Sequence, residues 1–573
     1  MKPTKPALVR ANKVLSRLSH SRYVELLKML CARHGSFDFA QEILRLLRSK
    51  SWAELLSYAD SLSSQSYDDA TRHFVANQFA SLVRKYPWNP VDVLTDPEGT
   101  ALKKWLSAEH ACKRHNQRFR LFQTLRSPHE DLLSRVRGFI RYVIGDSPNI
   151  ERIYELCDYT GGASLGCHGN RTNIAAKLSM EDTVTPGALV HYYNALAANA
   201  PLLSKFWEYR DYRDTGCRIY CLDNVFDKYV HSVRVVTHNK IAFVPKTAKT
   251  LRPIAVEPVG NGFLQKGTDL YLRQCLKRVG LDLSDQSRNR FFSKFGSEDW
   301  LSPLSFCTID LSSASDSIAT EMCRAVLPPD WFSFLNDIRS REYMLQDSTT
   351  PKEYEKFCSM GNGFCFPLET LLFAAIAAAS GAGIPRRDFV VYGDDIIVRK
   401  PHFDAVLRNL RIMGFKANTD KTFSEGPFRE SCGADWYAGE DVRPYTLDHC
   451  LDSVQNMYKF LNLSRRNQRT ADFFREVYPV VIGWLPTQFR LFRPFTGPAD
   501  SGIDVEGFEH LVSPLINLVR KDSVFRWYEL QSCPVRDKTE YPERVRILSL
   551  LRGDSTLYLR RRSTTRVVRK HGG

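Results

Sequence analysis

Two adjacent carboxylates, Asp394 and Asp395, lie between two short apolar runs, and this pattern constrains the fold more than any other part of the sequence. The runs 389–392 and 396–398 predict two β-strands, and Gly393 supplies the backbone freedom for a tight turn between them. Adjacent carboxylates repel one another at such a turn unless a cation neutralises them. We therefore expect an antiparallel hairpin with a divalent-metal site at its tip; a solvated Gly-Asp-Asp turn is the simpler alternative.

A third acidic residue, Asp310, follows another short apolar run, 306–309. Two divalent ions about 4 Å apart need roughly three carboxylates, so we expect Asp310 to lie beside the two aspartates of the hairpin. Asp316 follows after a serine-rich bend. It either accepts a hydrogen bond from a ribose hydroxyl or caps the N-terminus of a helix.

A glycine-flanked loop, SMGNG, precedes an apolar segment that begins at Phe364. Its small residues, Ser359 and Gly361, would let the backbone approach a nucleotide or a template, and Asn362 could hydrogen-bond a sugar. An ordinary connecting turn is the alternative interpretation.

Cations recur in two further segments. Lys246, Lys249 and Arg252 lie on a strand-like stretch, where they could neutralise a triphosphate and a leaving pyrophosphate, or simply protect a solvated edge strand. The segment 288–294 interleaves cations with aromatic residues, as surfaces for single-stranded nucleic acid do, but an ordinary amphipathic segment would have the same pattern.

The composition predicts a folded, basic protein. Lys and Arg number 80 against 64 Asp and Glu, and the resulting net charge of +16 favours a polyanionic partner. The contents of 43% apolar and 25% charged residues are typical of globular chains. The N-terminus shows no apolar run of signal-peptide length, so we expect a cytosolic protein.

Two other interpretations of the composition have less support. The apolar segment 364–384 contains Pro367 and Glu369, which favours a buried helix over a membrane span. The 14 cysteines include no CxxC pair and predict ordinary reduced thiols. The alternative, a zinc site, would use Cys167, His168, Cys217 and Cys221.

Six ordered stretches of the sequence are together more specific than any of them alone. They are VPKTAKTLRPIAVEP from Val244, LDLSDQSRNR from Leu281, TIDLSSASDS from Thr308, SMGNGF from Ser359, YGDD from Tyr392 and NTDKTFSEGPFRESCGADWYAG from Asn418. In this order and spacing the chain resembles the replicase (β) subunits of positive-strand RNA bacteriophages, the levivirus group. The resemblance covers roughly residues 240 to 444.

The resemblance implies an α+β fold with the shape of a right hand, in which the palm carries the GDD hairpin on an antiparallel sheet and the thumb is helical. We expect residues 1–235 to form a largely helical fingers and accessory region. Residues 236–295 would be a basic fingers segment that contacts the nucleotide. Residues 296–428 would be the catalytic palm, and residues 429–573 the end of the palm, the thumb and a basic C-terminal tail.

The same resemblance implies RNA-dependent RNA synthesis by two-metal nucleotidyl transfer from ribonucleoside triphosphates, with release of pyrophosphate. Asp310, Asp394 and Asp395 would bind two divalent ions, with Mg²⁺ expected first and Mn²⁺ or Ca²⁺ as substitutes. Lys421 falls where a lysine protonates the leaving group. Asp316 and Asn362 would select ribose, and Lys246, Lys249 and Arg252 would contact the triphosphate. Pro367 departs from the family pattern, which has an acidic residue there, and leaves Glu369 as the acid of that helix start.

The resemblance also implies partners. These are an RNA template and product, host elongation factors Tu and Ts, and the large RNA-binding protein of the small ribosomal subunit, all in the cytoplasm of a bacterial host. Three alternatives remain: a reverse transcriptase, a non-catalytic basic RNA-binding protein and a two-metal nuclease. Asp316 disfavours the first, because an acid that accepts a bond from a ribose hydroxyl suits RNA synthesis.

Overall fold

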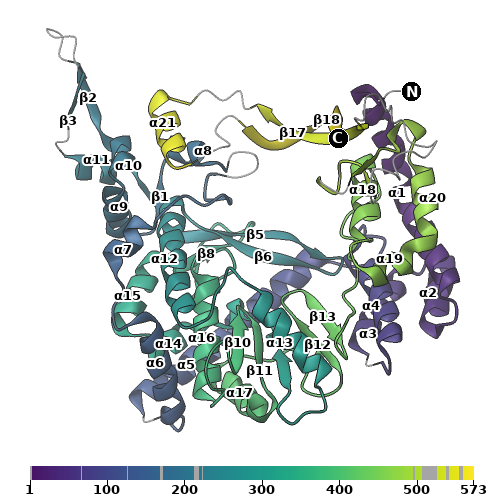
Figure 1. Cartoon of the computed structure of the whole chain (residues 1–573). Coiled ribbons are helices and arrows are strands. Elements are labelled where there is room, and N and C mark those ends of the chain that lie inside the picture. The colour runs from purple at the N-terminus through teal and green to yellow at the C-terminus, as the bar shows by residue number, and fades with distance from the viewer. Residues whose placement is uncertain are drawn as a thin grey trace.

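The computed structural model describes residues 3–65, 67–125, 127–167, 172–211, 218–221, 224–494, 497–505, 525–536, 541–553 and 559–572. Helices prevail in it, and short, mostly antiparallel sheets lie among them (Figure 1). The predicted α+β fold class is confirmed. In this described part of the chain, no helix has both the length and the apolar character to cross a membrane. His168 and Cys217 of the alternative zinc site lie outside the described residues.

The first helices of the chain share a hydrophobic core, the N–C core, with helices near its C-terminal end. Tyr23, Phe79 and Tyr458 are fully buried in it. Residues 7–93 therefore pack against the predicted thumb, and the predicted segment boundaries stay predictions. The helices are α1 (Lys5–Arg33), α2 (Asp38–Ser49), α3 (Trp52–Ser64), α4 (Ala70–Lys85), α18 (Val454–Leu463), α19 (Gln468–Phe474) and α20 (Tyr478–Trp484).

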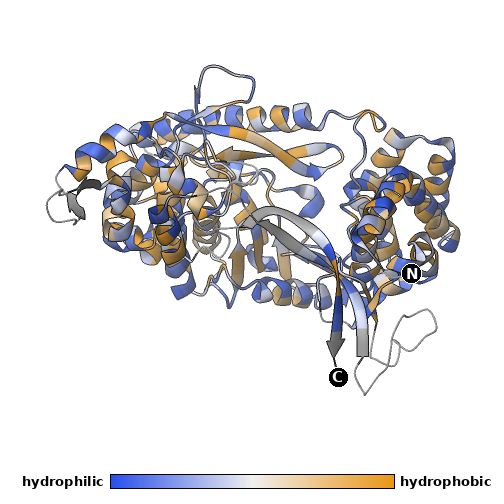
Figure 2. Cartoon of the chain, turned by 90° about the horizontal axis from the view of Figure 1, so that it is seen from above, coloured by the Kyte–Doolittle hydropathy of each residue, from blue (hydrophilic) through white to orange (hydrophobic). Residues whose placement is uncertain are grey.

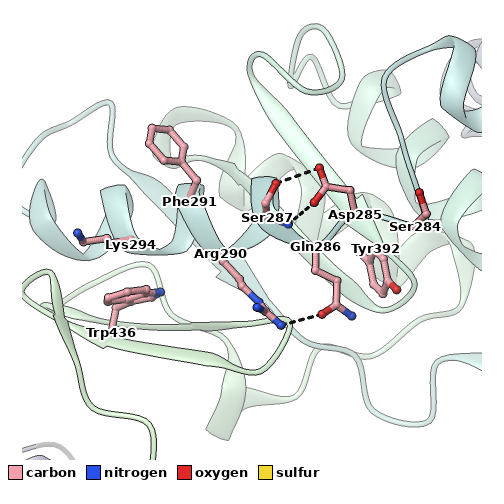
Figure 3. A pocket seen from close by; sticks show the side chains of 9 residues that line it. All are labelled: Ser284, Asp285, Gln286, Ser287, Arg290, Phe291, Lys294, Tyr392 and Trp436. Atoms are coloured by element: carbon pink, nitrogen blue, oxygen red, sulfur yellow. Dashed lines mark hydrogen bonds between the residues drawn. The ribbon is translucent and has the colours of Figure 1, made fainter. Parts of the chain in front are cut away.

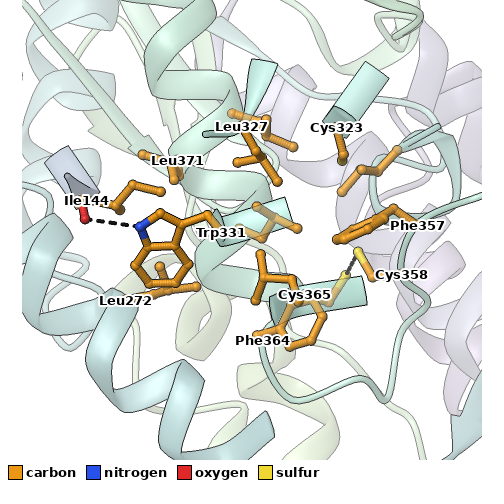
Figure 4. Packing of buried hydrophobic residues seen from close by; sticks show 14 of the residues in the cluster. Ile144, Leu272, Cys323, Leu327, Trp331, Phe357, Cys358, Phe364, Cys365 and Leu371 are labelled. Carbon is orange, nitrogen blue, oxygen red and sulfur yellow. Dashed lines mark hydrogen bonds between the residues drawn. The ribbon is translucent and has the colours of Figure 1, made fainter. Parts of the chain in front are cut away.

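A second core, the central core, joins the long helix α5 to the helices around the predicted palm. Trp331 is fully buried in it, and its Nε1 donates a hydrogen bond of 3.2 Å to the carbonyl oxygen of Ile144 (Figure 4). Helix α16 is buried along most of its length, which confirms the buried-helix interpretation. The helices are α5 (Pro97–Thr124), α6 (Glu130–Ile144), α12 (Val259–Arg278), α14 (Thr320–Val326), α15 (Pro329–Ile338) and α16 (Cys365–Ala379).

The predicted hairpin supplies strands β10 and β11 of a three-stranded antiparallel sheet of order β10-β11-β7, in which β11 is the middle strand. Alternate side chains of a strand point to opposite faces, and here both faces are covered. Val390 and Ile397 pack on Phe292 of α13 (Ser287–Glu298), whereas Val391 and Ile396 join the central core beside α16. The elements are β7 (Phe306–Ile309), β10 (Phe389–Tyr392), β11 (Asp395–Arg399) and the following helix α17 (Lys400–Met413).

The basic segment forms a long hairpin, as its β-branched residues predict. Strands β5 (His238–Thr247) and β6 (Thr250–Val256) belong to a four-stranded sheet with β8 (Glu342–Met344) and β9 (Lys352–Glu353). Ala248, at the tip of the hairpin, belongs to the N–C core. The hairpin thus connects the helices of the N–C core to those of the central core. These two groups of helices lie at opposite ends of the molecule when seen from above (Figure 2).

The remaining elements complete the described chain. The predicted basic tail forms strand β18 of a two-stranded ribbon with β17, although the side chains of Arg560, Arg561 and Arg562 lie outside the described residues. A sheet of β12 (Phe428–Ser431), β13 (Ala434–Tyr437) and β14 (Glu440–Asp441) packs beside α13. The others are α7 (Ile150–Glu155), α8 (Ile174–Ser179), β1 (Thr183–Val184), α9 (Leu189–Ala198), α10 (Ala200–Leu203), β2 (Glu208–Asp211), β3 (Arg218–Cys221), α11 (Val225–Ser232), β4 (Arg234–Val235), β15 (Phe492–Pro494), β16 (Ile503–Val505), β17 (Phe525–Arg536), α21 (Glu543–Leu551) and β18 (Leu559–Gly572).

Candidate active site

The register of the central sheet brings the three predicted metal-binding aspartates together. Ile396 pairs with Ile309 in antiparallel β11 and β7, so the next positions outward, Asp395 and Asp310, lie across from one another. Asp394 precedes Asp395 in the turn. The pKa values are consistent with this proximity: burial and then the charge of Asp394 raise the pKa of Asp395 to about 6, and partial burial, with a further contribution from Asp394, raises the pKa of the half-buried Asp310.

Protein donors hold two of these carboxylates. The backbone N–H of Cys432 donates to Oδ2 of Asp395 at 3.2 Å, and the Ser431 hydroxyl donates to Oδ1 at 3.3 Å. The Asn418 amide donates to Oδ1 of Asp310 at 3.3 Å. Both sets of donors come from the NTDK…FRESCG stretch, so that stretch forms one side of the site.

The donor set has the chemistry that Mg²⁺ prefers, because it consists of carboxylates whose charges repel one another at the end of a sheet. Among the residues that the structure describes, however, no group of three His, Cys, Asp or Glu side chains is arranged to hold a metal ion. The two-ion site stays a prediction.

Lys421 lies next to these carboxylates, at the end of a short 3-10 helix. Its Nζ is 2.8 Å from Oε1 of Glu430 and 3.9 Å from Oδ2 of Asp310. Burial lowers the pKa of Lys421, but the acids Glu430, Asp310 and Asp435 together outweigh burial, and the net shift is upward. The side chain is thus a protonated cation beside Asp310, and its role as a proton donor stays a prediction.

Lys421 belongs to a cluster of five cations that come from four separate segments. The pKa of Lys246 is lowered by desolvation of its ammonium and by repulsion from Lys104, Arg252, Lys85 and Lys421. Lys85 ends α4 and Lys104 lies in α5, so sequence reasoning from the basic hairpin missed both. Neither residue has a local signal that distinguishes it from other surface lysines. We call these five residues the cationic cluster.

Lys249 does not join the cationic cluster, although the sequence grouped it with Lys246 and Arg252. Its ammonium pairs with the Asp60 carboxylate of α3, to which Arg84 Nε also pairs at 2.7 Å. Lys249 therefore links the hairpin to the N-terminal helices through an ion pair.

The SMGNG loop packs under the basic hairpin rather than projecting into open space. Gly361 has a φ of +112°, and a Cβ on it would overlap the carbonyl oxygen of Ala255 in β6. Ser359 and Asn362 are buried, and Oδ1 of Asn362 accepts a 3.0 Å hydrogen bond from the backbone N–H of Phe364 at the start of α16. The loop thus approaches protein backbone, and sugar recognition by Asn362 stays a prediction.

Asp316 lies in a 3-10 helix, Ser315–Ser317, and the helix-cap alternative is wrong. The following helix α14 begins after Ala319, and no side chain caps it. Oδ1 of Asp316 instead accepts a 2.7 Å hydrogen bond from the ammonium of Lys356.

Glu369 of α16 is a residue whose position the sequence left undefined. It lies beneath the hairpin turn, because a Cβ on Gly393 would be 3.1 Å from its Oε1. Burial, followed by the charges of Asp394 and Asp316, raises the pKa of Glu369 well above its usual range. The neighbouring Thr370 hydroxyl accepts a 3.0 Å hydrogen bond from the backbone N–H of Gly393, which fixes the turn.

A cavity of about 610 Å³ opens beside Tyr392, the residue before the Gly-Asp-Asp turn. Helix α13 and strand β13 form its walls, with Arg290, Phe291 and Lys294 on one and Trp436 on the other (Figure 3). The ammonium of Lys294 lies 5.4 Å from the centre of the Trp436 ring. The segment 288–294 thus presents cations and aromatic rings to a cavity next to the candidate site.

Comparisons with known proteins agree with the motifs. A family model described as RNA replicase, beta-chain, matches residues 39–517. The RNA-directed RNA polymerase subunit beta of Escherichia virus Qbeta is 34% identical over 419 residues, which cover 72% of this chain and 64% of that protein.

Two further relatives give the same result. The corresponding subunit of Enterobacteria phage SP is 34% identical over 435 residues, which cover 74% of this chain and 70% of that protein. The RNA-directed RNA polymerase beta chain of Escherichia phage MS2 is 37% identical over 329 residues, covering 57% of this chain and 56% of that protein. The matched regions span between 56% and 70% of these relatives. The resemblance predicted from the six motifs is confirmed, and the chain belongs to the RNA replicase beta-chain family.

Proposed function

We propose that this chain is the template-copying subunit of an RNA-directed RNA polymerase, which replicates a phage single-stranded RNA genome in the cytoplasm of its bacterial host. The observation that carries the proposal is the pairing of β7 with β11, which sets Asp310 across from Asp395 at the end of one sheet. The cationic cluster adds to it, since an anionic triphosphate could lie between the cations and the metal-binding carboxylates.

In this mechanism Asp310, Asp394 and Asp395 would hold two divalent ions, Mg²⁺ by preference. Bound there, such ions would lower the pKa of the primer 3′ hydroxyl and neutralise charge on the leaving pyrophosphate. The electrostatics of these carboxylates support this role: burial and then the charge of Asp394 raise the pKa of Asp395 to about 6, and a bound divalent cation would offset the repulsion between the two carboxylates.

The other side chains of the site bind and orient the substrates. Lys246, Arg252, Lys85 and Lys104 bind the triphosphate, and Lys421 delivers a proton to the leaving pyrophosphate oxygen. Asp316 accepts a hydrogen bond from the ribose of the incoming nucleotide. An RNA strand passes the cavity beside Tyr392, where Trp436 and Phe291 offer stacking surfaces and Arg290 and Lys294 offer phosphate contacts.

Labelled ribonucleotide incorporation on an RNA template tests this function. The wild-type chain should extend a primer in the presence of Mg²⁺, and Asp394→Asn should reduce the rate by at least about a thousandfold, because one metal ligand and its charge are lost. Asp404→Asn is the matched control, since Asp404 is an exposed aspartate of α17. Wild-type rates for Asp394→Asn would refute the assignment.

Reverse transcription is the second candidate function, because it uses the same palm chemistry. Supplying deoxyribonucleotides alone separates the two candidates. We expect incorporation of ribonucleotides only, and efficient DNA synthesis on the same RNA template would favour the reverse transcriptase.

The proposed partners are host elongation factors Tu and Ts and the large RNA-binding protein of the small ribosomal subunit. Their support is family membership. Affinity purification of the full chain from infected cells, followed by mass spectrometry, should recover both elongation factors in stoichiometric amounts. Their absence from an active preparation would exclude them as required subunits.

A further inference from the structure

Lys356 carries a fully buried ammonium next to the candidate active site. Its Nζ donates to Oδ1 of Asp316 at 2.7 Å and lies 3.3 Å from Oε1 of Glu109. It also lies 4.0 Å from the centre of the Trp105 ring, within the range of a cation–π contact. A buried cation is costly unless charged partners surround it, so these contacts fix the ammonium in one place.

The anchoring side chains come from helix α5, far from the palm in sequence. Trp105 and Glu109 lie one helical turn apart and therefore on the same face of α5. Further hydrogen bonds hold this face against the chain around Lys356. Oε2 of Glu109 accepts a hydrogen bond of 2.8 Å from the backbone N–H of Glu355. The Asn116 amide donates a hydrogen bond of 2.7 Å to the carbonyl oxygen of Glu355.

The arrangement determines how the Asp316 carboxylate points. Within the described part of the chain, the bond from Lys356 to Oδ1 is the one hydrogen bond recorded for this carboxylate. A charge-assisted hydrogen bond is short and directional, so it orients the whole planar group, including Oδ2. The Asp316 side chain is 17% exposed, whereas Lys356 and Glu109 are 0% and 8% exposed. Of the three, the aspartate is the one that faces the solvent-accessible side.

We propose that Lys356, held in place by Glu109 and Trp105, is a positioning residue for ribose recognition, because it orients the Asp316 carboxylate toward the sugar of the incoming nucleotide. The inference rests on the proposed function and deepens it. It assigns substrate specificity to residues that touch neither the nucleotide nor the metal ions. It also gives α5 a specific task at the palm, beyond packing.

The test compares Lys356→Met with the wild-type full chain, using a ribonucleoside triphosphate and its 2′-deoxy analogue as separate substrates. Methionine keeps much of the buried stem and removes the ammonium. The kcat/KM ratio of ribo- to deoxynucleotide should fall about tenfold to hundredfold, the value of a hydrogen bond to a charged group. The kcat/KM for the ribonucleotide should fall, and the kcat/KM for the deoxynucleotide should stay unchanged.

Three further variants separate positioning from general structure. Lys352→Met, at an exposed lysine of the nearby β9, is the matched control and should keep the wild-type ratio. Lys356→Arg should have a ratio between those of Lys356→Met and the wild type. In an Asp316→Asn background, Lys356→Met should change the ratio no further, since the two residues act through one interaction.

An unchanged ratio in a folded Lys356→Met protein would overturn the inference, and so would equal losses for both substrates. Should Lys356→Met fail to fold, Glu109→Gln keeps the ammonium but removes one charge that anchors it, and it must then lower the ratio for the inference to stand. Failure of the proposed function looks different, because the wild-type chain would then incorporate neither substrate.

Discussion

Lys246 and Lys249 lie close together on one hairpin, yet their ammonium groups face different partners. Lys246 lies in the cationic cluster, whereas Lys249 pairs with Asp60 of α3. The tip of the hairpin lies between the two residues, so the chain has changed direction between Lys246 and Lys249. At the scale of single residues, two lysines of equal charge and similar position in the sequence therefore have different partners and different roles.

Lys246→Met should raise the KM for nucleoside triphosphates about tenfold, because one cation near the phosphates is worth about 1.4 kcal/mol. Lys249→Met is the matched control. It should leave KM unchanged and lower the free energy of unfolding by up to about 1 kcal/mol, as a partly exposed ion pair does. Steady-state incorporation kinetics and chemical denaturation measure the two effects. A larger KM change for Lys249→Met would contradict the division of roles.

Gly361→Ala should destabilise the protein by about 2 kcal/mol or more, because the residue has a positive φ and its Cβ would overlap the backbone of β6. Gly138→Ala in α6 is the control. Nothing lies within 4 Å of a Cβ at Gly138, and alanine should stabilise that helix by about 0.5–1 kcal/mol. Thermal unfolding compares both with the wild type. Equal melting temperatures for both variants would mean that the loop can move away from the hairpin.

At the scale of elements, helix α4 connects the N-terminal helices to the β12–β13 sheet through a buried histidine. His73 packs on the rings of Phe428 and Tyr437, with ring centroids 4.5 and 5.2 Å away. Burial disfavours the imidazolium and lowers the pKa of His73 to about 4. This interface is therefore sensitive to acid.

The sign of the pH effect follows from the two pKa values. In the unfolded chain His73 takes up its proton near pH 6.5, whereas in the folded chain it does so only near pH 4, so protons favour unfolding between these values. The contribution of His73 is fully present above pH 6.5 and is lost as pH falls toward 4, by about 2 to 3 kcal/mol. His73→Gln should lose less stability over this range than the wild type.

The exposed His110 of α5 provides the control for this prediction. Denaturation curves at pH 7 and pH 4.5 give the difference in unfolding free energy for each protein. His110→Gln should match the wild-type difference. An identical difference in His73→Gln would show that the imidazole is not the source of the acid sensitivity.

At the scale of the whole molecule, elements that belong to two separate hydrophobic cores contribute side chains to the site. The N–C core supplies Lys85, the central core carries the hairpin with the aspartates, and the β5–β6 hairpin connects them. Ligands that bind between the two bodies should therefore stabilise the entire chain.

Mg²⁺ should raise the melting temperature of the RNA-free protein, since a ligand that binds only the folded state at 100 times its Kd adds about 2.7 kcal/mol. Asp394→Asn should lose most of this rise, while Asp404→Asn keeps it, and a chelator should reverse the effect. An equal rise in Asp394→Asn would place the stabilising ion elsewhere.

The sequence by itself determined the parts of this protein that depend on local chemistry. Two short apolar runs and a glycine turn predict the 389–398 hairpin, and a third apolar run predicts the buried strand before Asp310. The order of six motifs was enough to identify the family and the α+β fold. These signals are local because strand periodicity and turn preferences depend on neighbouring residues.

Only the tertiary structure decided which distant side chains share the site. Lys85 and Lys104 join the cationic cluster, Glu369 lies under the turn, and Lys356 meets Asp316 because helices remote in sequence pack against the sheet. Lys249 was assigned to the triphosphate from its strand, and its ion pair with Asp60 is visible only in space. The physical reason is that a buried charge selects its partner by distance in the folded chain, and no sequence pattern encodes that distance.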